Sequence, residues 1–215
     1  MRGRVYGQEP PHGPARCRGM STDPYWNHNT HYHPWILEQV PAGARTALDI
    51  GCGDGLLARK LATRCDAVLG VDIDDTVIAT APPAPNVHLE QADFRELDDT
   101  FDMVTAVATL HHVPVRDGIA ALRHLVAPGG TLAVVGLWKM HPLTDFHYLP
   151  LLPAIRGLDW WQRKSLGGPQ AAVRDPQETL SEIRSVAGEL LPGAQIRRRL
   201  MWRYTLVWRR PRQLG

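Results

Sequence analysis

Between residues 46 and 138, short apolar runs alternate with segments that have the apolar period of a helix. The apolar runs predict strands and the intervening segments predict helices. The predicted strands are 46–50, 67–73, 86–93, 101–109 and 131–138, and the predicted helices are 56–62, 75–81 and 117–126. Strands that alternate with helices imply a mostly parallel sheet covered on both faces. The sequence therefore predicts an α/β fold with a doubly wound sheet.

The C-terminal part extends this sheet. Residues 176–191 predict a long helix, and residues 196–200 and 204–208 predict two final strands. The gap between these strands is short enough for a hairpin, which favours an antiparallel element at one edge of the sheet. The arginines and aromatic residues of RRRLMWRYTLVWRR also resemble a nucleic-acid-binding pattern. Strand alternation puts the large apolar residues on one face. Sheet packing then explains the aromatic residues, and a solvated opposite face explains the arginines. Those apolar residues are Leu200, Trp202, Tyr204, Leu206 and Trp208.

The chain length and composition indicate one domain. A chain of 215 residues that is 44% hydrophobic can bury one full core and is short for two. Residues 1–20 are rich in Gly, Pro and Arg and predict a disordered extension, which leaves residues 21–215 as the domain. A short helix over 35–40, starting at Pro34, is expected near its beginning. Residues 139–175 interrupt the strand and helix pattern, which is typical of a lid or an insertion.

Charge and cysteine content exclude several classes. Lys+Arg 24 against Asp+Glu 22 gives a net charge of +2, which makes no strong case for nucleic acid or a membrane surface. The three cysteines form no CxxC pair, which argues against structural disulfides and a thiolate zinc site. No segment reaches the length of about 20 apolar residues that a membrane span requires. A cytoplasmic protein is expected.

The loop GCGDG, residues 51–55, lies between the first predicted strand and its helix, where α/β sheets bind ligands. Its glycines allow a sharp turn and a close approach to a ligand. A nicotinamide fingerprint would read GxGxxG, and the loop has a different third spacing. The carboxylates of Asp49 and Asp54 would repel a pyrophosphate and attract a cation. S-adenosylmethionine carries both a sulfonium and an ammonium group, so it fits this loop better.

Acidic residues also end the next two predicted strands. Asp72 stands where a carboxylate can accept both hydroxyls of a ribose, and Ile73 follows it. Asp93 is placed for an adenine amino group and Phe94 for the face of its ring. For Asp72 the alternative is a helix N-cap, although Asp74 could cap instead.

LDIGCGDG, the strand ends at Asp72 and Asp93, FDMV and APGG occur in this order over residues 32–137. Together they resemble the class I S-adenosylmethionine-dependent methyltransferases, in particular the small-molecule branch similar to ubiquinone and menaquinone methyltransferases. The resemblance implies a Rossmann-like, seven-stranded sheet, with S-adenosylmethionine as cofactor and S-adenosylhomocysteine as product. The cofactor contacts that we expect are Asp49, Gly51, Cys52, Gly53, Asp72, Ile73, Asp93, Phe94, Ala106 and Val107. The same resemblance implies an N-terminal cap over residues 21–41 and places residues 139–175 on the substrate side.

The residues after the fourth predicted strand bear on the acceptor. They read TLHH, where methyltransferases similar to the adenine-amino and glutamine-amide class have Asn-Pro-Pro-Tyr/Phe, and the chain has no Pro-Cys pair for a cytosine-carbon mechanism. We therefore expect a nitrogen, oxygen or carbon nucleophile of a small organic molecule. Candidate bases are His111, Tyr25 and His33. The tryptophans favour an aromatic or indole-containing natural product. The candidate substrate contacts are Trp26, His28, Tyr32, Trp160 and Trp161.

Other interpretations remain open for several of these features. His111 can be a pocket histidine that bonds the substrate or packs against the cofactor, while His112 is expected to face the other way. Trp160 and Trp161 can be core residues under the insertion. We expect no metal at HNTHYH, because the histidines lie in an unanchored loop. Alternative functions are an RNA methyltransferase, a non-catalytic methyltransferase-like partner subunit and an NAD-dependent dehydrogenase, and the chain is expected as a monomer or homodimer.

Overall fold

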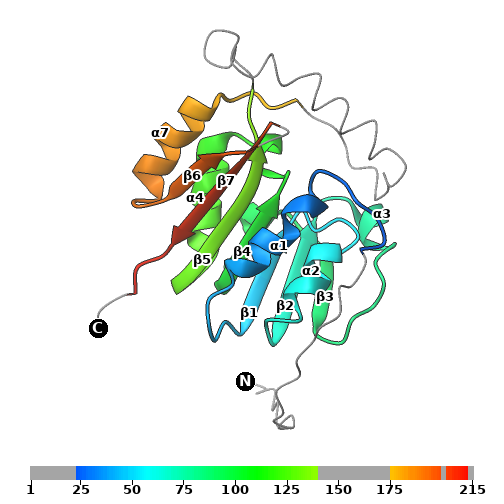
Figure 1. Cartoon of the computed structure of the whole chain (residues 1–215). Helices are drawn as coiled ribbons and strands as arrows, with labels where there is room; N and C mark the ends of the chain where they lie inside the picture. Colours follow the sequence, from blue (N-terminus) through cyan, green and yellow to red (C-terminus); the bar gives the residue numbers. More distant parts are fainter. Residues whose placement is uncertain (1–22, 140–174, 200–201, 213–215) are drawn as a thin grey trace.

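The computed structural model describes residues 23–139, 175–199 and 202–212. Within these residues, seven strands form one sheet in the order β3-β2-β1-β4-β5-β7-β6 (Figure 1). The strands are β1 Thr46–Ile50, β2 Ala67–Asp72, β3 Val87–Gln91, β4 Phe101–Val107, β5 Val126–Leu137, β6 Gln195–Arg198 and β7 Arg203–Arg209. The order reverses between β1 and β4, as a doubly wound sheet requires. The predicted α/β class and the seven-stranded sheet are confirmed.

The strand directions also agree with the sequence. The pairs β3·β2, β2·β1, β1·β4 and β4·β5 are parallel. β7 inserts between β5 and β6 and is antiparallel to both. The antiparallel C-terminal hairpin at one edge of the sheet is therefore confirmed, with β6 as the outermost strand.

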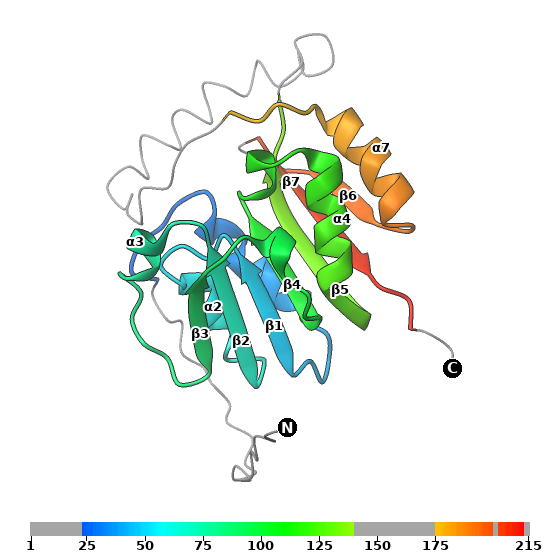
Figure 2. The same ribbon diagram turned by 180° about the vertical axis from the view of Figure 1, so that it is seen from behind.

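Helices cover both faces of the sheet (Figures 1 and 2). The described α-helices are α1 His33–Glu38, α2 Leu56–Leu61, α3 Asp75–Ile78, α4 Val115–Leu125 and α7 Leu180–Leu190, and the short 3-10 turns are η1 Thr30–Tyr32, η2 Phe94–Glu96 and η3 Leu110–His112. Ile36 of α1 and Leu61 of α2 share one apolar cluster with Val135 of β5. Ile119 of α4 and Ile183 of α7 belong to a second cluster on the opposite face.

The final strand shows the predicted alternation. Tyr204, Leu206 and Trp208 are buried in the cluster that α4 and α7 cover. Thr205 and Val207 point to the other face, which follows from the period of two in a strand. Sheet packing therefore accounts for Tyr204 and Trp208, whereas Trp202 is half-buried in the turn before β7 and Leu200 lies outside the described residues.

Several element boundaries differ from the prediction for local reasons. The long C-terminal helix begins at Leu180 instead of 176, because the Thr179 side chain and Glu182 form a reciprocal cap. The third helix ends at Ile78 instead of 81, shortly before Pro82 and Pro83. The fifth strand begins at Val126 instead of 131, and its pairing with β4 shifts register near Phe101.

Some predictions fall outside the described residues. The extension 1–20 lies there, as do Trp160, Trp161 and nearly all of the insertion 139–175. In the part of the chain that the structure describes, no helix is long and apolar enough to cross a bilayer.

Candidate cofactor site at the carboxyl edge of the sheet

The candidate site lies where β1, β2 and β4 end. β1 and β4 are neighbours in the sheet, yet the chain leaves β1 toward β2 and reaches β4 only later. In doubly wound sheets, the crevice beside such a reversal, at the carboxyl ends of the strands, is the common ligand site. The loop Gly51–Gly55, Asp72 and Val107 all lie at this edge.

The glycine loop adopts a backbone that only glycine accepts readily. Gly51, Gly53 and Gly55 have φ angles of 68°, 54° and 70°. A Cβ atom on Gly51 would lie 2.1 Å from Oγ1 of Thr109, so the loop after β1 packs directly against the loop after β4. Thr109 Oγ1 lies 3.1 Å from the carbonyl oxygens of both Ile50 and Val107. The two loops form one packed unit.

Asp72 connects the end of β2 to this unit. One carboxylate oxygen accepts a hydrogen bond from the Gly53 N–H at 2.9 Å, and the other accepts one from the Asp74 N–H at 3.1 Å. Asp74, not Asp72, caps the following helix, because its side chain accepts a bond from the Thr76 N–H. Ile73 is a large apolar side chain that is 72% exposed. Asp72 is thus held at the crevice with an exposed apolar surface next to it.

Asp49 lies under the loop. Its side chain is 2% exposed, and one oxygen accepts a hydrogen bond from Thr105 Oγ1 at 2.8 Å. The other oxygen has no hydrogen-bond partner among the described residues. Burial raises the pKa of Asp49 to about 7, the Thr105 hydrogen bond opposes this shift, and the Asp72 charge adds to it. A buried carboxylate with an unused oxygen is an arrangement that a bound cation would stabilise.

The remaining residues that we expected to contact the cofactor differ in what they can offer to a ligand. The Cys52 side chain is buried beside Gly70, where a Cβ would lie 3.0 Å from the cysteine Cβ. Its N–H is bonded to the carbonyl of Val71 at 3.1 Å, so neither group is directed to a ligand. Ala106 is buried within β4, whereas Val107 ends that strand and is half-buried. The φ of 54° at Ala108 turns the backbone sharply directly after it.

Asp93 and Phe94 make contacts that the sequence did not predict. Asp93 caps η2 and forms an ion pair with Arg95, whose Nη2 lies 2.5 Å from a carboxylate oxygen. The hydrogen bond with Arg95 lowers the pKa of Asp93. Phe94 is only 7% exposed and packs in the core cluster beneath α4. The expectation that its ring covers an adenine is therefore not supported, and Ile73 is the apolar side chain that reaches the surface.

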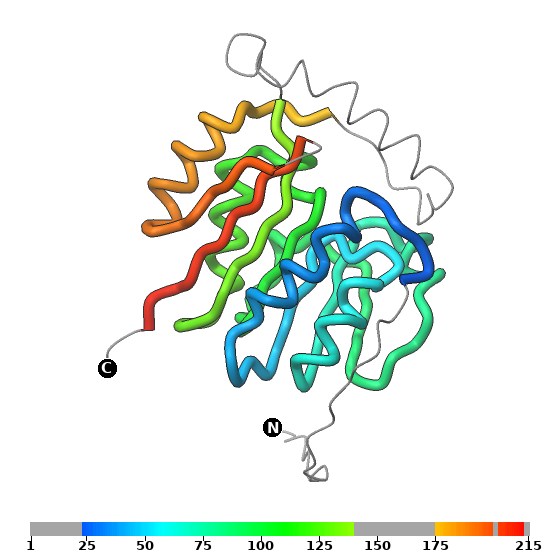
Figure 3. Tube along the Cα trace, viewed as in Figure 1, coloured from blue at the N-terminus to red at the C-terminus, as the bar shows by residue number. Residues whose placement is uncertain are grey.

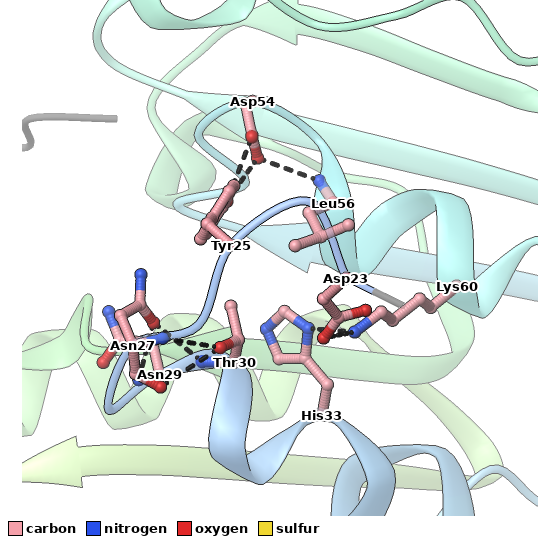
Figure 4. A network of polar contacts seen from close by, with 9 residues as sticks. All are labelled: Asp23, Tyr25, Asn27, Asn29, Thr30, His33, Asp54, Leu56 and Lys60. Atoms are coloured by element: carbon pink, nitrogen blue, oxygen red, sulfur yellow. Dashed lines mark hydrogen bonds and ion pairs between the residues drawn. The ribbon is translucent and has the colours of Figure 1, made fainter. Parts of the chain in front are cut away.

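The segment before α1 lies beside the glycine loop, as the tube trace shows (Figure 3). The Tyr25 hydroxyl is 3.0 Å from both carboxylate oxygens of Asp54, to which it donates (Figure 4). Asp54 also accepts a hydrogen bond from the Leu56 N–H at the start of α2. Burial and the Asp54 charge raise the pKa of Tyr25. Tyr25 is consequently a protonated hydrogen-bond donor near neutral pH, and the role of base does not suit it.

His33 makes a different contact. Lys60 Nζ lies 3.1 Å from His33 Nδ1 and 2.7 Å from a carboxylate oxygen of Asp23 (Figure 4). Burial lowers the pKa of His33 to about 3, and the charge of Lys60 adds to this shift. The neutral imidazole therefore accepts a bond from Lys60 and fixes α1 to α2. Because its Nδ1 atom is engaged with Lys60, the structure does not support the expectation that His33 is the base.

The other aromatic residues of the N-terminal segment divide into two groups. The Trp26 ring packs edge-on against His28 and His31, with centroids 5.7 and 6.4 Å apart. Trp26 and His28 are half-buried and remain candidates for substrate contact. Tyr32 is 7% exposed and packs in the core cluster of α1 and α2, so substrate contact by its side chain is not supported.

His111 and His112 form η3 after β4. Both rings are half-buried, and their centroids lie 4.1 Å apart at an interplanar angle of 41°. The expectation that His112 faces away from His111 is therefore wrong. Within the described residues, no group of three or more His, Cys, Asp or Glu side chains is arranged to hold a metal ion.

Sequence reasoning missed several residues that shape this edge. Thr105 donates a hydrogen bond to Asp49, and Thr109 packs where a side chain on Gly51 would lie. Arg95 forms an ion pair with Asp93. The contacts of Thr105 with Asp49 and of Thr109 with Ile50 join residues more than 50 positions apart, so no local sequence pattern could predict them. The spacing of Arg95, two residues after Asp93, was the one available signal.

Comparisons with known proteins agree with this arrangement. A family model described as a methyltransferase domain matches residues 47–130. An uncharacterized methyltransferase of Mycobacterium tuberculosis is 38% identical over 205 residues, which is 88% of this chain and 99% of the relative. A ubiquinone biosynthesis O-methyltransferase of Pseudomonas fluorescens is 31% identical over 126 residues, which is 49% of this chain and 54% of the relative.

Solved structures give the same fold. The amino pentose methyltransferase of calicheamicin biosynthesis from Micromonospora echinaspora, with S-adenosylmethionine bound, has a TM-score of 0.58 at 19% identity and covers 85% of this chain and 89% of its own. The magnesium protoporphyrin IX methyltransferase of Synechocystis, with S-adenosylhomocysteine bound, has a TM-score of 0.56 at 22% identity, with coverage of 84% and 81%. The mycobacterial relative, a methyltransferase, aligns over nearly its whole length. The methyltransferase domain match, the sheet order and the glycine loop of this chain point to the same family, so the chain belongs to the class I S-adenosylmethionine-dependent methyltransferases.

Proposed function

We propose that this enzyme transfers the methyl group of S-adenosylmethionine to a nitrogen, oxygen or carbon nucleophile of a small organic molecule. The observation that carries the proposal is Asp72, which is bonded to Gly53 and Asp74 at the carboxyl edge and is followed by the exposed Ile73. This pair offers a carboxylate for ribose hydroxyls and an apolar surface for a flat base. The dehydrogenase alternative does not agree with the family membership.

The charge of the crevice supports a cationic cofactor. Asp49, Asp54 and Asp72 surround the glycine loop, and one oxygen of Asp49 is unused among the described residues. Carboxylates in a partly desolvated crevice favour cations and disfavour the pyrophosphate of a dinucleotide. S-adenosylmethionine, when bound, supplies an electrophilic methyl group on a sulfonium. We assign Asp72 and Ile73 to its nucleoside part, and Asp49 to the cationic part through the loop.

The protein contributes mainly position and, where needed, a base. In an in-line displacement at the methyl carbon the leaving group becomes neutral, so no donors for a new anion are required. A nucleophile that must lose a proton requires a base, and we assign this role to His111 on η3. Its ring lies after β4, next to the loop that packs on Gly51. Tyr25, as a protonated donor on Asp54, positions the N-terminal segment over the loop.

A small-molecule acceptor is supported by two observations. The residues after β4 are TLHH in place of the Asn-Pro-Pro-Tyr/Phe stretch, and the related O-methyltransferases bear the name of ubiquinone biosynthesis. Trp26 and His28 present aromatic edges on the N-terminal segment, which would suit a flat or aromatic acceptor. An aromatic or indole-containing natural product is the acceptor class that we propose.

The cofactor assignment is tested by calorimetry with S-adenosylhomocysteine and NADH as separate ligands. We expect the wild type to bind S-adenosylhomocysteine and not NADH, and Asp72→Ala to lose most of that affinity while it still unfolds as a cooperatively folded protein. Asp98→Ala is the matched control, because Asp98 is an exposed aspartate outside the crevice. Preferred binding of NADH, or equal affinity of Asp72→Ala and wild type, would contradict the assignment.

A further inference from the structure

A second concave surface lies away from the carboxyl edge. It is a groove of about 650 Å³ on the face of β6 and β7 opposite to the helices α4 and α7. Trp35 of α1 and Gln39, the residue after α1, line it on one side, and Pro192 and Gly193 line it as well. Both β5 and β4 separate these strands from β1 and β2 in the sheet. The groove is therefore distinct from the candidate cofactor site.

The pairing of β6 with β7 places arginines on the floor of this groove. Arg197 pairs with Thr205, and Gln195 pairs with Val207, so their side chains share one face. Arg209 lies on the same face two residues beyond Val207, since Tyr204, Leu206 and Trp208 are buried on the other. Arg199 continues the row, and its Nε donates a hydrogen bond to Thr205 Oγ1 at 3.1 Å.

These arginines are not neutralised by the residues around them. Arg197, Arg199 and Arg209 line the groove, and none of its lining residues carries a carboxylate. Some arginines elsewhere in the described chain do have acidic partners: Arg45 pairs with Asp66 and Arg116 with Glu189. No ion pair joins the three groove arginines to a described carboxylate. Like charges gathered in a concave surface raise the local potential and attract anions.

We propose that this groove binds an organic phosphate of nucleotide size. Guanidinium groups match phosphate oxygens with paired hydrogen bonds, and three of them suit more than one phosphate. The half-buried indole of Trp35 offers a flat wall against which a ring can stack. The volume lies in the range of small-molecule sites.

The test is calorimetry with ATP in the absence of magnesium, with tripolyphosphate and with adenosine, each at saturating S-adenosylhomocysteine. Occupying the cofactor edge in this way leaves the groove as the site that the titration reports. We expect ATP to bind, tripolyphosphate to bind more weakly because it lacks a ring, and adenosine to give no measurable heat.

Variants locate the binding. The double variant Arg197→Gln/Arg209→Gln should lose at least about tenfold in ATP affinity, because two charge-assisted contacts are removed. Its affinity for S-adenosylhomocysteine should not change. Arg45→Gln is the matched control, since it removes one exposed arginine directly before β1, outside the groove lining, and should bind ATP as the wild type does.

Four results would overturn the proposal. These are no binding of ATP or tripolyphosphate at millimolar concentration, displacement of ATP by S-adenosylhomocysteine, and unchanged ATP affinity in the double variant. The fourth is tighter binding of a single-stranded RNA oligonucleotide than of ATP, because it would make the groove a nucleic-acid surface. If the cofactor assignment fails, the separate titration with S-adenosylhomocysteine will show no binding. ATP is then titrated into the protein without S-adenosylhomocysteine, and the groove proposal is still tested.

Discussion

The carboxylate of Asp72 and the backbone N–H of Gly53 are joined by a hydrogen bond of 2.9 Å, which links the end of β2 to the loop after β1. The residue that we assign to the ribose thus also holds the glycine loop in position. A site whose ligand groups are fixed before binding loses less conformational freedom when the ligand arrives.

The two roles of Asp72 can be separated by comparing Asp72→Asn with Asp72→Ala. An asparagine oxygen can still accept the Gly53 bond, but its amide group cannot replace the charge or accept the Asp74 bond. We expect Asp72→Ala to weaken S-adenosylhomocysteine about 10- to 100-fold, because hydrogen bonds to a charged group contribute about 1.5–3 kcal/mol. Asp72→Asn should be intermediate. Calorimetry and thermal unfolding check both variants, and identical affinities for the two would contradict the dual role.

The contact of Tyr25 with Asp54 should couple the N-terminal segment to the loop. Tyr25→Phe should cost about 1 kcal/mol of unfolding free energy, since a half-buried hydrogen bond is lost. We also expect S-adenosylhomocysteine to bind several-fold more weakly, because the segment over the loop is less well held. The control is a double-mutant cycle with Asp54→Asn, monitored by urea unfolding. If the effects of the two substitutions simply add, the two side chains do not act together.

His111 and His112 provide a matched pair of variants on one 3-10 turn. His111→Ala should lower the rate of methyl transfer about 100-fold or more, as expected for loss of a general base, with little change in affinity for S-adenosylhomocysteine. His112→Ala should retain most of the rate. Steady-state rates with labelled cofactor and calorimetry on the same samples separate catalysis from binding. Equal rates for His111→Ala and wild type would remove His111 as the base.

The raised pKa of Asp49 predicts that cofactor binding depends on pH. Near pH 7 the buried carboxyl group is partly protonated, and a cation nearby favours its ionised form. Binding of S-adenosylmethionine should therefore release protons at pH 7, and its affinity should fall as the pH decreases below about 7. Calorimetry in buffers of different ionisation enthalpy measures this release, and Asp49→Asn should abolish it. Proton uptake on binding, or none at all, would contradict the assignment of Asp49.

The lowered pKa of His33 predicts acid sensitivity. The unfolded chain takes up a proton at His33 near pH 6.5, whereas the folded protein does so only near pH 3. The stability that this neutral imidazole contributes is present above pH 6.5 and is lost as the pH falls toward 3, by about 2 kcal/mol at pH 5. His33→Gln should reduce this loss between pH 7 and pH 5 in urea unfolding. His88→Gln, at an exposed histidine, should behave as the wild type.

The sequence predicted the sheet and its ligand edge because these follow from patterns with a fixed period. Apolar runs and glycine turns located β1 to β4, and Asp72 followed from the end of an apolar strand. The direction of a side chain after the strand end was not predictable in the same way. Phe94 is buried directly after Asp93, which caps a 3-10 turn, and the rings of His111 and His112 lie with their centroids 4.1 Å apart.

Contacts between segments that are distant in the sequence could not be predicted from it either. His33 is a residue type that often acts as a base. Its partner Lys60 lies on another helix, however, and the contact between them makes His33 a neutral hydrogen-bond acceptor. Tyr25 and Asp54 are 29 residues apart, and no sequence period connects them. Such pairings depend on how α1 packs against α2, which is a tertiary property.

The most direct test of the central claim is transfer of labelled methyl from S-adenosylmethionine into an extract of the source organism, followed by separation into small-molecule, protein and nucleic-acid fractions. The wild type should place label in the small-molecule fraction, and Asp72→Ala should place almost none there. Label that enters only RNA or protein would contradict a small-molecule acceptor. Absence of label in every fraction, despite intact binding of S-adenosylhomocysteine, would contradict catalysis and favour a non-catalytic methyltransferase-like subunit.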